Sequence, residues 1–241
     1  MPEAKALEKI PRPKDPKTIR RMMNHSAYRF NSWDDLWHAA NVALAHCTWN
    51  GVPVLQNQFD LHRYYDLIVE NKPEVIVETG VYGGGSAMFF MDVLDMLNMH
   101  EVPYIGIDLE THYIYPAAFE HSHSHLWIQR DCLAQETVEA IRPYVKGKKC
   151  LMVLDSVHTK EHVDEELKLY APLVTTRNSY LVVSDSDHNG RHILADYGPS
   201  AGEATDAFLK TDAGKNFVPD KDIELRYGPF TVSPNAWLKR V

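Results

Sequence analysis

Short apolar runs alternate with segments of helical periodicity from residue 75 onward. The runs have the length and the Val and Ile content of buried strands, and the other segments repeat apolar residues three and four positions apart. This alternation predicts βαβ units, a mostly parallel sheet and an α/β fold with helices on both faces. The expected strands are 75–77, 104–107, 127–128, 151–154 and 180–183, and the expected helices are 86–98, 135–145, 161–170 and 203–210.

The two ends of the chain depart from this alternation. Before residue 75 we expect a helix from Trp33 to Cys47, a turn over 49–53, and a second helix that Asp60 caps and that ends near Asn71. After residue 210 we expect two more strands, at about 223–227 and 230–232. We therefore divide the chain into an N-terminal arm with a helical addition, 1–57, and a main domain, 58–241.

Acidic residues end or follow the expected strands. The first, second, fourth and fifth strands lead into Glu78, Asp108, Asp155 and Asp185, and Asp131 follows the third. In open parallel sheets, ligands bind beyond the carboxyl ends of the strands. The recurrence of carboxylates at this position predicts a binding site at that edge of the sheet.

A glycine-rich loop follows the first of these strands. It reads Glu78-Thr79-Gly80-Val81-Tyr82-Gly83-Gly84-Gly85-Ser86, with Ser86 placed to cap the next helix. Tyr82 stands where a dinucleotide fingerprint needs glycine, and no Gly-Lys-Ser/Thr of a phosphate-binding loop is present. The carboxylate of Glu78 would repel a pyrophosphate but attract a cationic ligand.

S-adenosylmethionine carries such a cationic group together with a ribose diol. Glu78 suits the cationic part, and Asp108 can accept hydrogen bonds from both ribose hydroxyls. Asp131 is a candidate adenine contact, with helix capping as the alternative role. The loop could also be a glycine-rich turn that serves only tight packing.

These residues resemble motif I of class I methyltransferases and, more narrowly, the cephalosporin-hydroxylase-like/rhamnosyl O-methyltransferase family. The resemblance runs in order over about four fifths of the chain. The matching stretches are Trp49-x-Gly51-Val52-Pro53, Glu78-Thr79-Gly80, Gly83-Gly84-Gly85-Ser86-Ala87, Gly106-Ile107-Asp108, Leu154-Asp155-Ser156-x-His158-x-x-x-His162-Val163, Glu166-Leu167-x-x-Tyr170-Ala171-Pro172-Leu173-Val174, Ser179-Tyr180-Leu181-Val182-Val183, Asn189-Gly190 and Trp237-Leu238-x-Arg240.

The resemblance implies a Rossmann-like class I methyltransferase with a seven-stranded sheet and one antiparallel strand near the C-terminus. It implies transfer of a methyl group from S-adenosylmethionine to a hydroxyl of a small sugar or natural-product acceptor, as in antibiotic and lipid pathways. The residues expected to bind the cofactor are Glu78, Gly80, Tyr82, Gly84, Ser86, Asp108, Asp131 and Asp155.

The resemblance also implies a divalent metal, usually Mg²⁺, that holds the acceptor's hydroxyls. Asp155 and Asp185 end adjacent strands and supply the oxygen ligands that Mg²⁺ prefers. Related enzymes have a Glu-Asp pair at the second position, where this chain has Ser184-Asp185. Asp187 or His188 could compensate, or the metal could bind weakly or not at all.

His158 follows Asp155 by three residues and is by resemblance the general base that removes the hydroxyl proton. A surface or helix-capping histidine is the alternative. The tract His121-Ser122-His123-Ser124-His125 could bind a metal, but we expect an exposed loop because no cysteine flanks it.

Composition restricts the partners. The chain carries 25 Lys and Arg against 33 Asp and Glu, for a net charge of −8. This charge argues against an extended basic surface that would bind nucleic acid or an anionic membrane. No apolar run reaches the ~20 residues of a membrane span, and the basic segment 1–21 lacks the apolar core of a secretory signal. Three widely spaced cysteines favour a reduced, cytoplasmic protein.

The aromatic segment around Tyr28, Phe30, Trp33 and Trp37 is a candidate interface of a homo-oligomer. Two other functions stay open at this point. One is a dinucleotide-dependent oxidoreductase, against which Tyr82 argues. The other is a non-catalytic or accessory protein that only binds the cofactor, which Ser184 keeps open.

Overall fold

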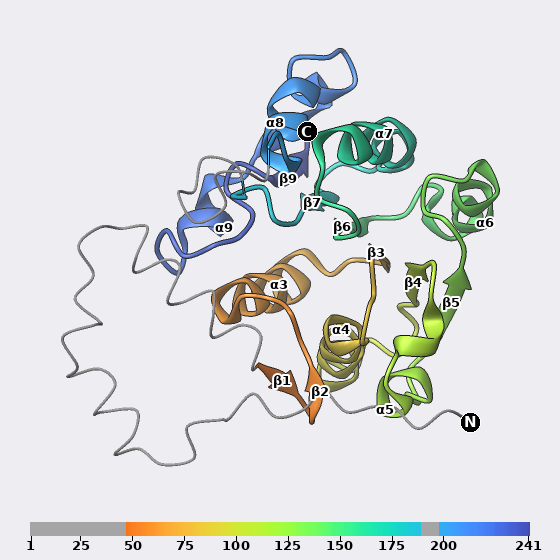
Figure 1. Ribbon diagram of the computed structural model, residues 1–241. Coiled ribbons are helices and arrows are strands. Elements are labelled where there is room, and N and C mark those ends of the chain that lie inside the picture. The colour runs from red at the N-terminus through yellow and green to blue at the C-terminus, as the bar shows by residue number, and fades with distance from the viewer. Residues whose placement is uncertain (1–46, 189–197) are drawn as a thin grey trace.

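A seven-stranded sheet forms the centre of the molecule (Figure 1). The computed structural model describes residues 47–188 and 198–241. The strand order is β5-β4-β3-β6-β7-β9-β8, and β9 alone runs in the direction opposite to the other six strands of this sheet. Its strands are β3 (Val75–Thr79), β4 (Tyr104–Asp108), β5 (His125–Gln129), β6 (Cys150–Leu154), β7 (Tyr180–Val183), β8 (Phe217–Pro219) and β9 (Trp237–Arg240). The predicted Rossmann-like topology is confirmed.

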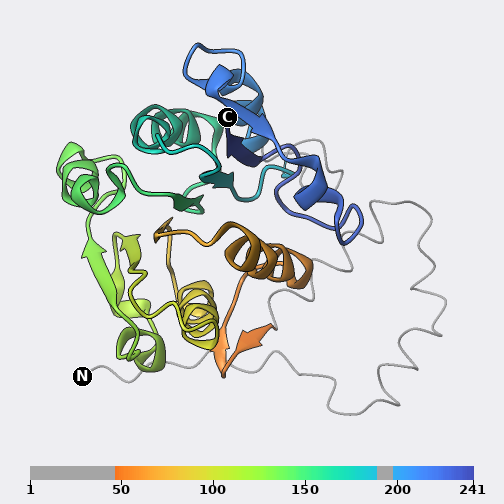
Figure 2. The ribbon, with the colours of Figure 1, turned by 180° about the vertical axis from the view of Figure 1, so that it is seen from behind.

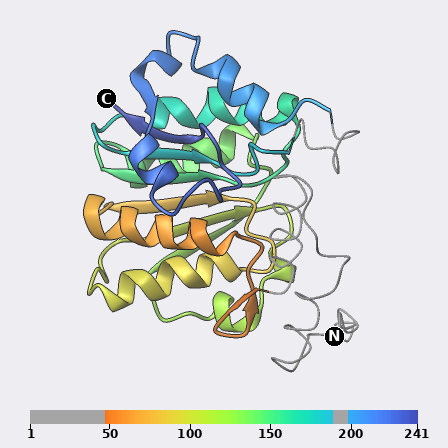
Figure 3. The same ribbon diagram turned by 90° about the vertical axis from the view of Figure 1, so that its left-hand side faces the viewer.

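Helices cover both faces of the sheet, as the edge-on view shows (Figure 3). Helices α3 and α4 lie on one face, and α6, α7 and α8 lie on the other (Figure 2). The α-helices are α3 (Gln58–Asn71), α4 (Gly85–Met96), α5 (Pro116–Phe119), α6 (Gln135–Val145), α7 (Lys160–Tyr170), α8 (Ala201–Phe208) and α9 (Lys221–Leu225). Short 3₁₀ turns span Thr111–Tyr113, Ala171–Leu173 and Gly214–Asn216.

The core is divided into two layers by the sheet. In β3, Val75 and Val77 pack in the layer under α6 and α7, whereas Ile76 packs in the layer under α3 and α4. Successive side chains of a strand point to opposite faces, so a strand covered on both sides is apolar throughout. This requirement explains why the central strands are unbroken runs of buried residues.

A small hairpin precedes the main sheet. Strands β1 (Thr48–Trp49) and β2 (Val52–Pro53) pair antiparallel around Asn50 and Gly51. Both turn residues have positive φ, 46° and 84°, as a two-residue type I′ turn requires. The turn predicted over 49–53 is therefore confirmed.

Two predicted helix caps are wrong. Helix α3 is capped by Asn57, whose side chain accepts from the amide of Phe59, and Asp60 lies inside the first turn. Helix α4 is capped by Gly84 at φ 83°, so Ser86 is the second residue of the helix. Asp60 is not the cap because its carboxylate is engaged in a buried ion pair with Arg63.

The two strands predicted at 223–227 and 230–232 are also wrong. Residues 221–225 form helix α9, and no strand is assigned from 226 to 236. The backbone of this segment bonds to side chains instead of a neighbouring strand. The Arg63 guanidinium donates to the carbonyls of Ile223, Glu224, Gly228 and Phe230, and Asp60 accepts from the amide of Val232.

Several sequence-based expectations lie outside the described residues. They are the basic arm 1–21, the aromatic segment 28–37, nearly all of the helix expected from Trp33 to Cys47, and Asn189-Gly190. Within the described ranges, no helix combines the length and apolar character needed to cross a bilayer.

Candidate active site

Two adjoining cavities lie at the carboxyl edge of the sheet. They have volumes of about 240 and 270 Å³ and share Gly80, Tyr82, Asp155 and Ser156 in their walls. The first cavity is further lined by Ile107, Asp108, Leu109, Arg130, Asp131, Cys132, Val157 and His162. The second is further lined by Pro53, Leu55, Gln56, Val81, Gly83, Gly85, Ser86, His158 and Asp185. Eight of the ten predicted site residues therefore line one continuous region.

Gly80 allows the loop to approach the end of β6 closely. A Cβ at this position would lie 2.0 Å from the carbonyl oxygen of Asp155, and φ is +79°. Both facts exclude any larger side chain without a shift of the backbone. The glycine thus holds the loop against Asp155, at the junction between the two cavities.

Asp108 anchors the glycine-rich loop from the end of β4. Its Oδ2 accepts from the amide of Tyr82 at 2.8 Å, and its Oδ1 accepts from the amide of Glu110 at 2.9 Å. The carboxylate is half-buried and faces the first cavity. Each carboxylate oxygen keeps a second lone pair, so it can still accept from a ligand hydroxyl.

Asp131 is not the N-cap of α6, so the capping role is wrong, and its contact with the cofactor stays a prediction. It lines the first cavity, and its Oδ1 accepts from the amide of Leu133 at 2.9 Å, which closes the turn before α6. The N-cap of α6 itself is Ala134. Asp131 is exposed, so its carboxylate remains open to solvent and to a ligand.

Glu78 and Gly84 lie behind the cavities and line neither of them. Glu78 is fully buried in β3 and accepts a hydrogen bond from the Tyr104 hydroxyl. Burial raises the pKa of Glu78 to about 7, although the hydrogen bond from Tyr104 opposes this. Gly84 packs against Ile114 and Ala118, where a Cβ would approach both side chains to 2.9 Å.

The second cavity contains a cluster of Asp155, His158 and Asp185. Ligand atoms of these three residues all lie within 4.8 Å of one another, and His158 Nε2 is 3.1 Å from Asp185 Oδ2. Asp155 accepts from Gln56 Nε2 at 2.5 Å. The predicted proximity of Asp155, His158 and Asp185 is confirmed, because β6 and β7 are adjacent and parallel.

The electrostatics of this cluster favour a bound cation. Burial, then the negative charges of Asp185 and Glu78, raise the pKa of Asp155 well above its usual value. Two carboxylates at this distance repel each other, and a divalent cation between them relieves that repulsion. The side-chain oxygen of Gln56, Oε1, is also buried in the wall of the second cavity and has no hydrogen-bond partner among the described residues.

His158 has the environment of a base that is neutral near pH 7. Burial lowers the pKa of its imidazole, with the neighbouring charge of Asp185 opposing and His188 reinforcing the shift. The His188 ring stacks on it at a centroid distance of 5.4 Å. Asp185 itself has φ 54°, a left-handed conformation that turns its side chain toward His158 at some conformational cost.

A hydrogen-bonded network behind the first cavity was not predicted. Glu166 of α7 is buried and accepts from the hydroxyls of Thr79 and Ser156 at 2.7 and 2.9 Å. The Ser156 hydroxyl also lies 2.9 Å from His162 Nε2. This network fixes the chain immediately after Asp155. No role was predicted for Gln56 or Glu166. Glu166 stands in one of the stretches that resemble the family, but neither residue lies at a strand end, and single Gln and Glu residues are common.

The comparisons with known proteins agree with this geometry. The profile of the family described as Rhamnosyl O-methyltransferase/CmcI matches residues 41–241. A protein named "Rhamnosyl O-methyltransferase" from Mycobacterium leprae (strain TN) is 31% identical over 207 residues, which cover 85% of this chain and 87% of the relative. The chain belongs to the rhamnosyl O-methyltransferase/CmcI family.

Other members of the family extend the comparison. A "Rhamnosyl O-methyltransferase" of Mycobacterium tuberculosis (strain ATCC 25618 / H37Rv) is 27% identical over 85% of this chain and 82% of its own. A CmcI structure described as a Mg-SAM form superposes with a TM-score of 0.64 at 19% identity, covering 95% of this chain and 87% of the other. An SAH form of CmcI gives a TM-score of 0.61 at 18% identity, with coverage of 95% and 94%.

Membership of the rhamnosyl O-methyltransferase/CmcI family confirms the predicted family and the predicted class of enzyme, an O-methyltransferase. It decides against the dinucleotide-dependent oxidoreductase. The likeness to CmcI supports the fold, including the antiparallel strand β9 near the C-terminus.

Proposed function

We propose that this protein transfers a methyl group from S-adenosylmethionine to a hydroxyl of a sugar-bearing small molecule, with Mg²⁺ bound beside the acceptor. The observation that carries the proposal is the junction of the two cavities at Gly80 and Asp155. One cavity presents carboxylates suited to a nucleoside, and the other presents a carboxylate pair with a histidine. The curated relatives named rhamnosyl O-methyltransferase support a sugar hydroxyl as the acceptor.

The first cavity fits the adenosine part of the cofactor. Asp108 retains free lone pairs that can accept from both ribose hydroxyls, and Asp131 and Cys132 border the space beyond it. Tyr82 and Gly80, at the junction, would contact the methionine part, and Ser86 lines the second cavity next to it. Glu78 and Gly84 would act on the cofactor through the shape of the loop, since they line neither cavity.

The second cavity fits a hard divalent cation. Asp155 and Asp185 would hold it through carboxylate oxygens, which are the ligands that Mg²⁺ prefers, and water would complete its shell. Ser184 contributes no charge here, so the protein supplies two carboxylates at most from this pair. When bound, Mg²⁺ supplies a positive charge that fixes the acceptor's hydroxyls and lowers the pKa of the one that reacts.

The protein's own groups then position the acceptor and move its proton. When bound, S-adenosylmethionine supplies the electrophilic methyl group. In the neutral ring, His158 Nε2 carries the proton that is donated to Asp185 at 3.1 Å, so the unprotonated Nδ1 takes the proton from the acceptor hydroxyl; the lowered pKa of His158 keeps the ring neutral before the step. The Asp185 carboxylate stabilises the imidazolium that forms. The loop around Gly80 holds the reacting groups in line and excludes water.

The proposal is tested by turnover. Purified protein is incubated with isotopically labelled S-adenosylmethionine, Mg²⁺ and a panel of rhamnosylated and other hydroxylated acceptors, and methylated product is identified by mass spectrometry. We expect product with sugar acceptors and a loss of rate when EDTA removes the metal. Binding of S-adenosylmethionine without transfer to any sugar acceptor would contradict the proposed acceptor class, and unchanged rates in EDTA would contradict the metal.

Replacing Asp108 by alanine is expected to raise the Kd for S-adenosylmethionine by about 10- to 100-fold. Hydrogen bonds to a charged group contribute about 1.5–3 kcal/mol each, and each 1.4 kcal/mol is about tenfold in affinity. Calorimetric titration with S-adenosylmethionine measures the change. Asp108→Asn keeps one oxygen for the Tyr82 amide, so it separates loss of ligand contacts from loss of the loop anchor.

Glu110→Ala is the matched control for this experiment. Glu110 is an exposed carboxylate two residues away whose side chain lines neither cavity. It should leave the Kd within about twofold, in line with an exposed side chain that touches no ligand. Equal affinities of the Asp108 and Glu110 variants would place the ribose elsewhere.

A further inference from the structure

The histidine tract 121–125 is not the exposed loop that the sequence predicted. Its histidines point inward and its serines outward: His123 is buried, whereas Ser122 and Ser124 are exposed. Two of the histidines meet aspartates of α4, with His121 Nε2 3.0 Å from Asp92 and His123 Nδ1 2.6 Å from Asp95. The tract therefore packs its polar rings onto one helix, at the end of the sheet where β5 begins.

The contact between His121 and Asp92 is explained by an ordinary hydrogen bond from a neutral imidazole. The His121 Nδ1 accepts from the backbone amide of His123 at 3.0 Å, so the ring proton of the neutral form is on Nε2. That proton is donated to Asp92. Donors and acceptors match here with a neutral imidazole, and no further cation is needed.

The contact between His123 and Asp95 does not pair a donor with an acceptor when the imidazole is neutral. The His123 Nε2 lies 2.7 Å from the carbonyl oxygen of Val102, which can only accept, so the ring proton of the neutral form is on Nε2. The lone pair on Nδ1 then faces the carboxylate oxygen of Asp95 at 2.6 Å. Two acceptors at this distance require a positive charge. A second proton fits the 2.6 Å separation as it stands, and a zinc ion, with bonds of about 2.0 Å to each atom, would bind both once they move apart to about 3.3 Å.

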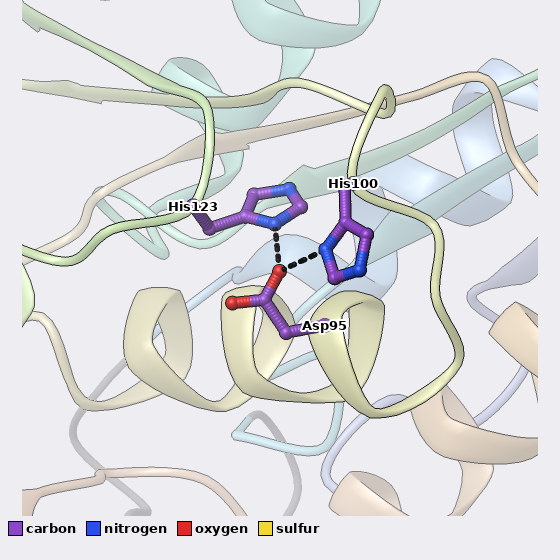
Figure 4. Close-up of side chains that lie close together, drawn as sticks. All are labelled: Asp95, His100 and His123. Atoms are coloured by element: carbon purple, nitrogen blue, oxygen red, sulfur yellow. Dashed lines mark hydrogen bonds and ion pairs between the residues drawn. The ribbon is translucent and has the colours of Figure 1, made fainter.

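A third group converges on the same oxygen. His100, in the loop after α4, places its Nδ1 3.0 Å from Asp95 Oδ1 (Figure 4). The two imidazoles thus approach one carboxylate oxygen, from the loop after α4 and from the chain that enters β5. All three ligand atoms lie within 4.8 Å of one another.

The geometry points to a zinc site formed by Asp95 Oδ1, His100 Nδ1 and His123 Nδ1. Two imidazole nitrogens and one carboxylate are a common protein ligand set for zinc, and imidazole nitrogen favours it over Mg²⁺. The bond from His123 Nε2 to the Val102 carbonyl fixes the tautomer whose Nδ1 is free to coordinate, as is usual for metal-bound histidines. Water completes the coordination on the exposed side of His100.

This site is separate from the active site. Asp95 lies ten residues along α4 from Gly85, which is about 15 Å along the helix axis. The first turn of the same helix continues the glycine-rich loop. A zinc ion at Asp95 would tie the far end of α4 to the loop after it and to the start of β5, so its effect is on stability and not on the chemical step.

Zinc binding to the whole, chelator-stripped protein tests the proposal. A competing chromophoric chelator measures the number of zinc equivalents and their affinity, and thermal unfolding is followed with and without zinc. Zinc can also bind at Asp155 and Asp185, or at Cys132, His162 and Glu166. The count is therefore made in the Asp185→Asn chain that also carries His162→Ala. We expect one equivalent there, and a rise in Tm of about 5 °C or more when zinc is well above its Kd.

His100→Ala is the decisive variant, because His100 is 61% exposed and its loss should leave the fold intact. The matched control is His112→Ala, whose side chain is 63% exposed and also lies beside a carboxylate. We expect His100→Ala to weaken zinc binding at least about tenfold and to abolish the rise in Tm, while His112→Ala preserves both. Asp95→Asn should behave like His100→Ala. Equal zinc binding by the two histidine variants, or no zinc equivalent in the chain with Asp185→Asn and His162→Ala, would overturn the proposal and leave a protonated His123 as the cation.

Discussion

His158→Ala is expected to lower kcat for methyl transfer by about 10²- to 10⁴-fold, the contribution typical of a positioned general base. The imidazole is the group in the second cavity that can take a proton near neutral pH while it touches a carboxylate of the cluster. Burial lowers the pKa of His158 and keeps the ring in its basic form. The Kd for S-adenosylmethionine should change by less than about twofold, because His158 lines only the second cavity.

The measurement is steady-state turnover of a sugar acceptor with Mg²⁺, beside calorimetric binding of the cofactor. His188→Ala is the informative companion, since His188 stacks on His158 and belongs to a second acidic cluster with Asp185. A modest loss is expected there. If His188→Ala abolished turnover while His158→Ala retained it, the base would be His188. If neither variant lost more than about tenfold, proton removal would need no histidine.

Arg63→Ala is expected to reduce the free energy of unfolding by about 3–5 kcal/mol, the cost of breaking a buried ion pair by removing one partner. Both Arg63 and Asp60 are almost completely buried, and the guanidinium donates to Asp60 at 2.9 Å and to four backbone carbonyls. Burial already raises the pKa of Asp60 to about 6 against the opposing effects of Val232 and Arg63. Without Arg63, the carboxylate and the carbonyls of 223–230 lose their partner together.

Urea unfolding followed by circular dichroism gives this free energy. Arg226→Ala is the control, because Arg226 forms a comparable ion pair with Asp66 and Glu70 on the surface. Exposed pairs contribute about 1 kcal/mol or less. A loss for Arg63→Ala no larger than that for Arg226→Ala would mean that the buried ion pair contributes no more to stability than the surface pair.

The sequence by itself determined the order of the central elements and the chemistry of their ends. Strands β3, β4, β6 and β7 are buried over nearly their whole length, whereas the edge strand β5 is only partly buried. A strand covered on both faces needs an apolar run, which is visible along the chain. The carboxyl ends of parallel strands share one edge, and the acidic residues found there meet by topology alone. For this reason Asp155 and Asp185 were expected at one site, and His158 was added by the family resemblance and by its position three residues after Asp155.

Other features depended on contacts between distant segments, which only the tertiary structure decided. The segment 223–227 has the residue pattern of a strand. However, the guanidinium of Arg63 in α3, about 160 residues earlier in the chain, donates hydrogen bonds to backbone carbonyls of this region. The segment forms a helix and a loop instead. His123 belongs to a tract that looks solvent-exposed, yet its ring is buried on Asp95. A side chain's partner across the fold leaves no periodic signal in the sequence, because a single long-range hydrogen bond constrains only two positions.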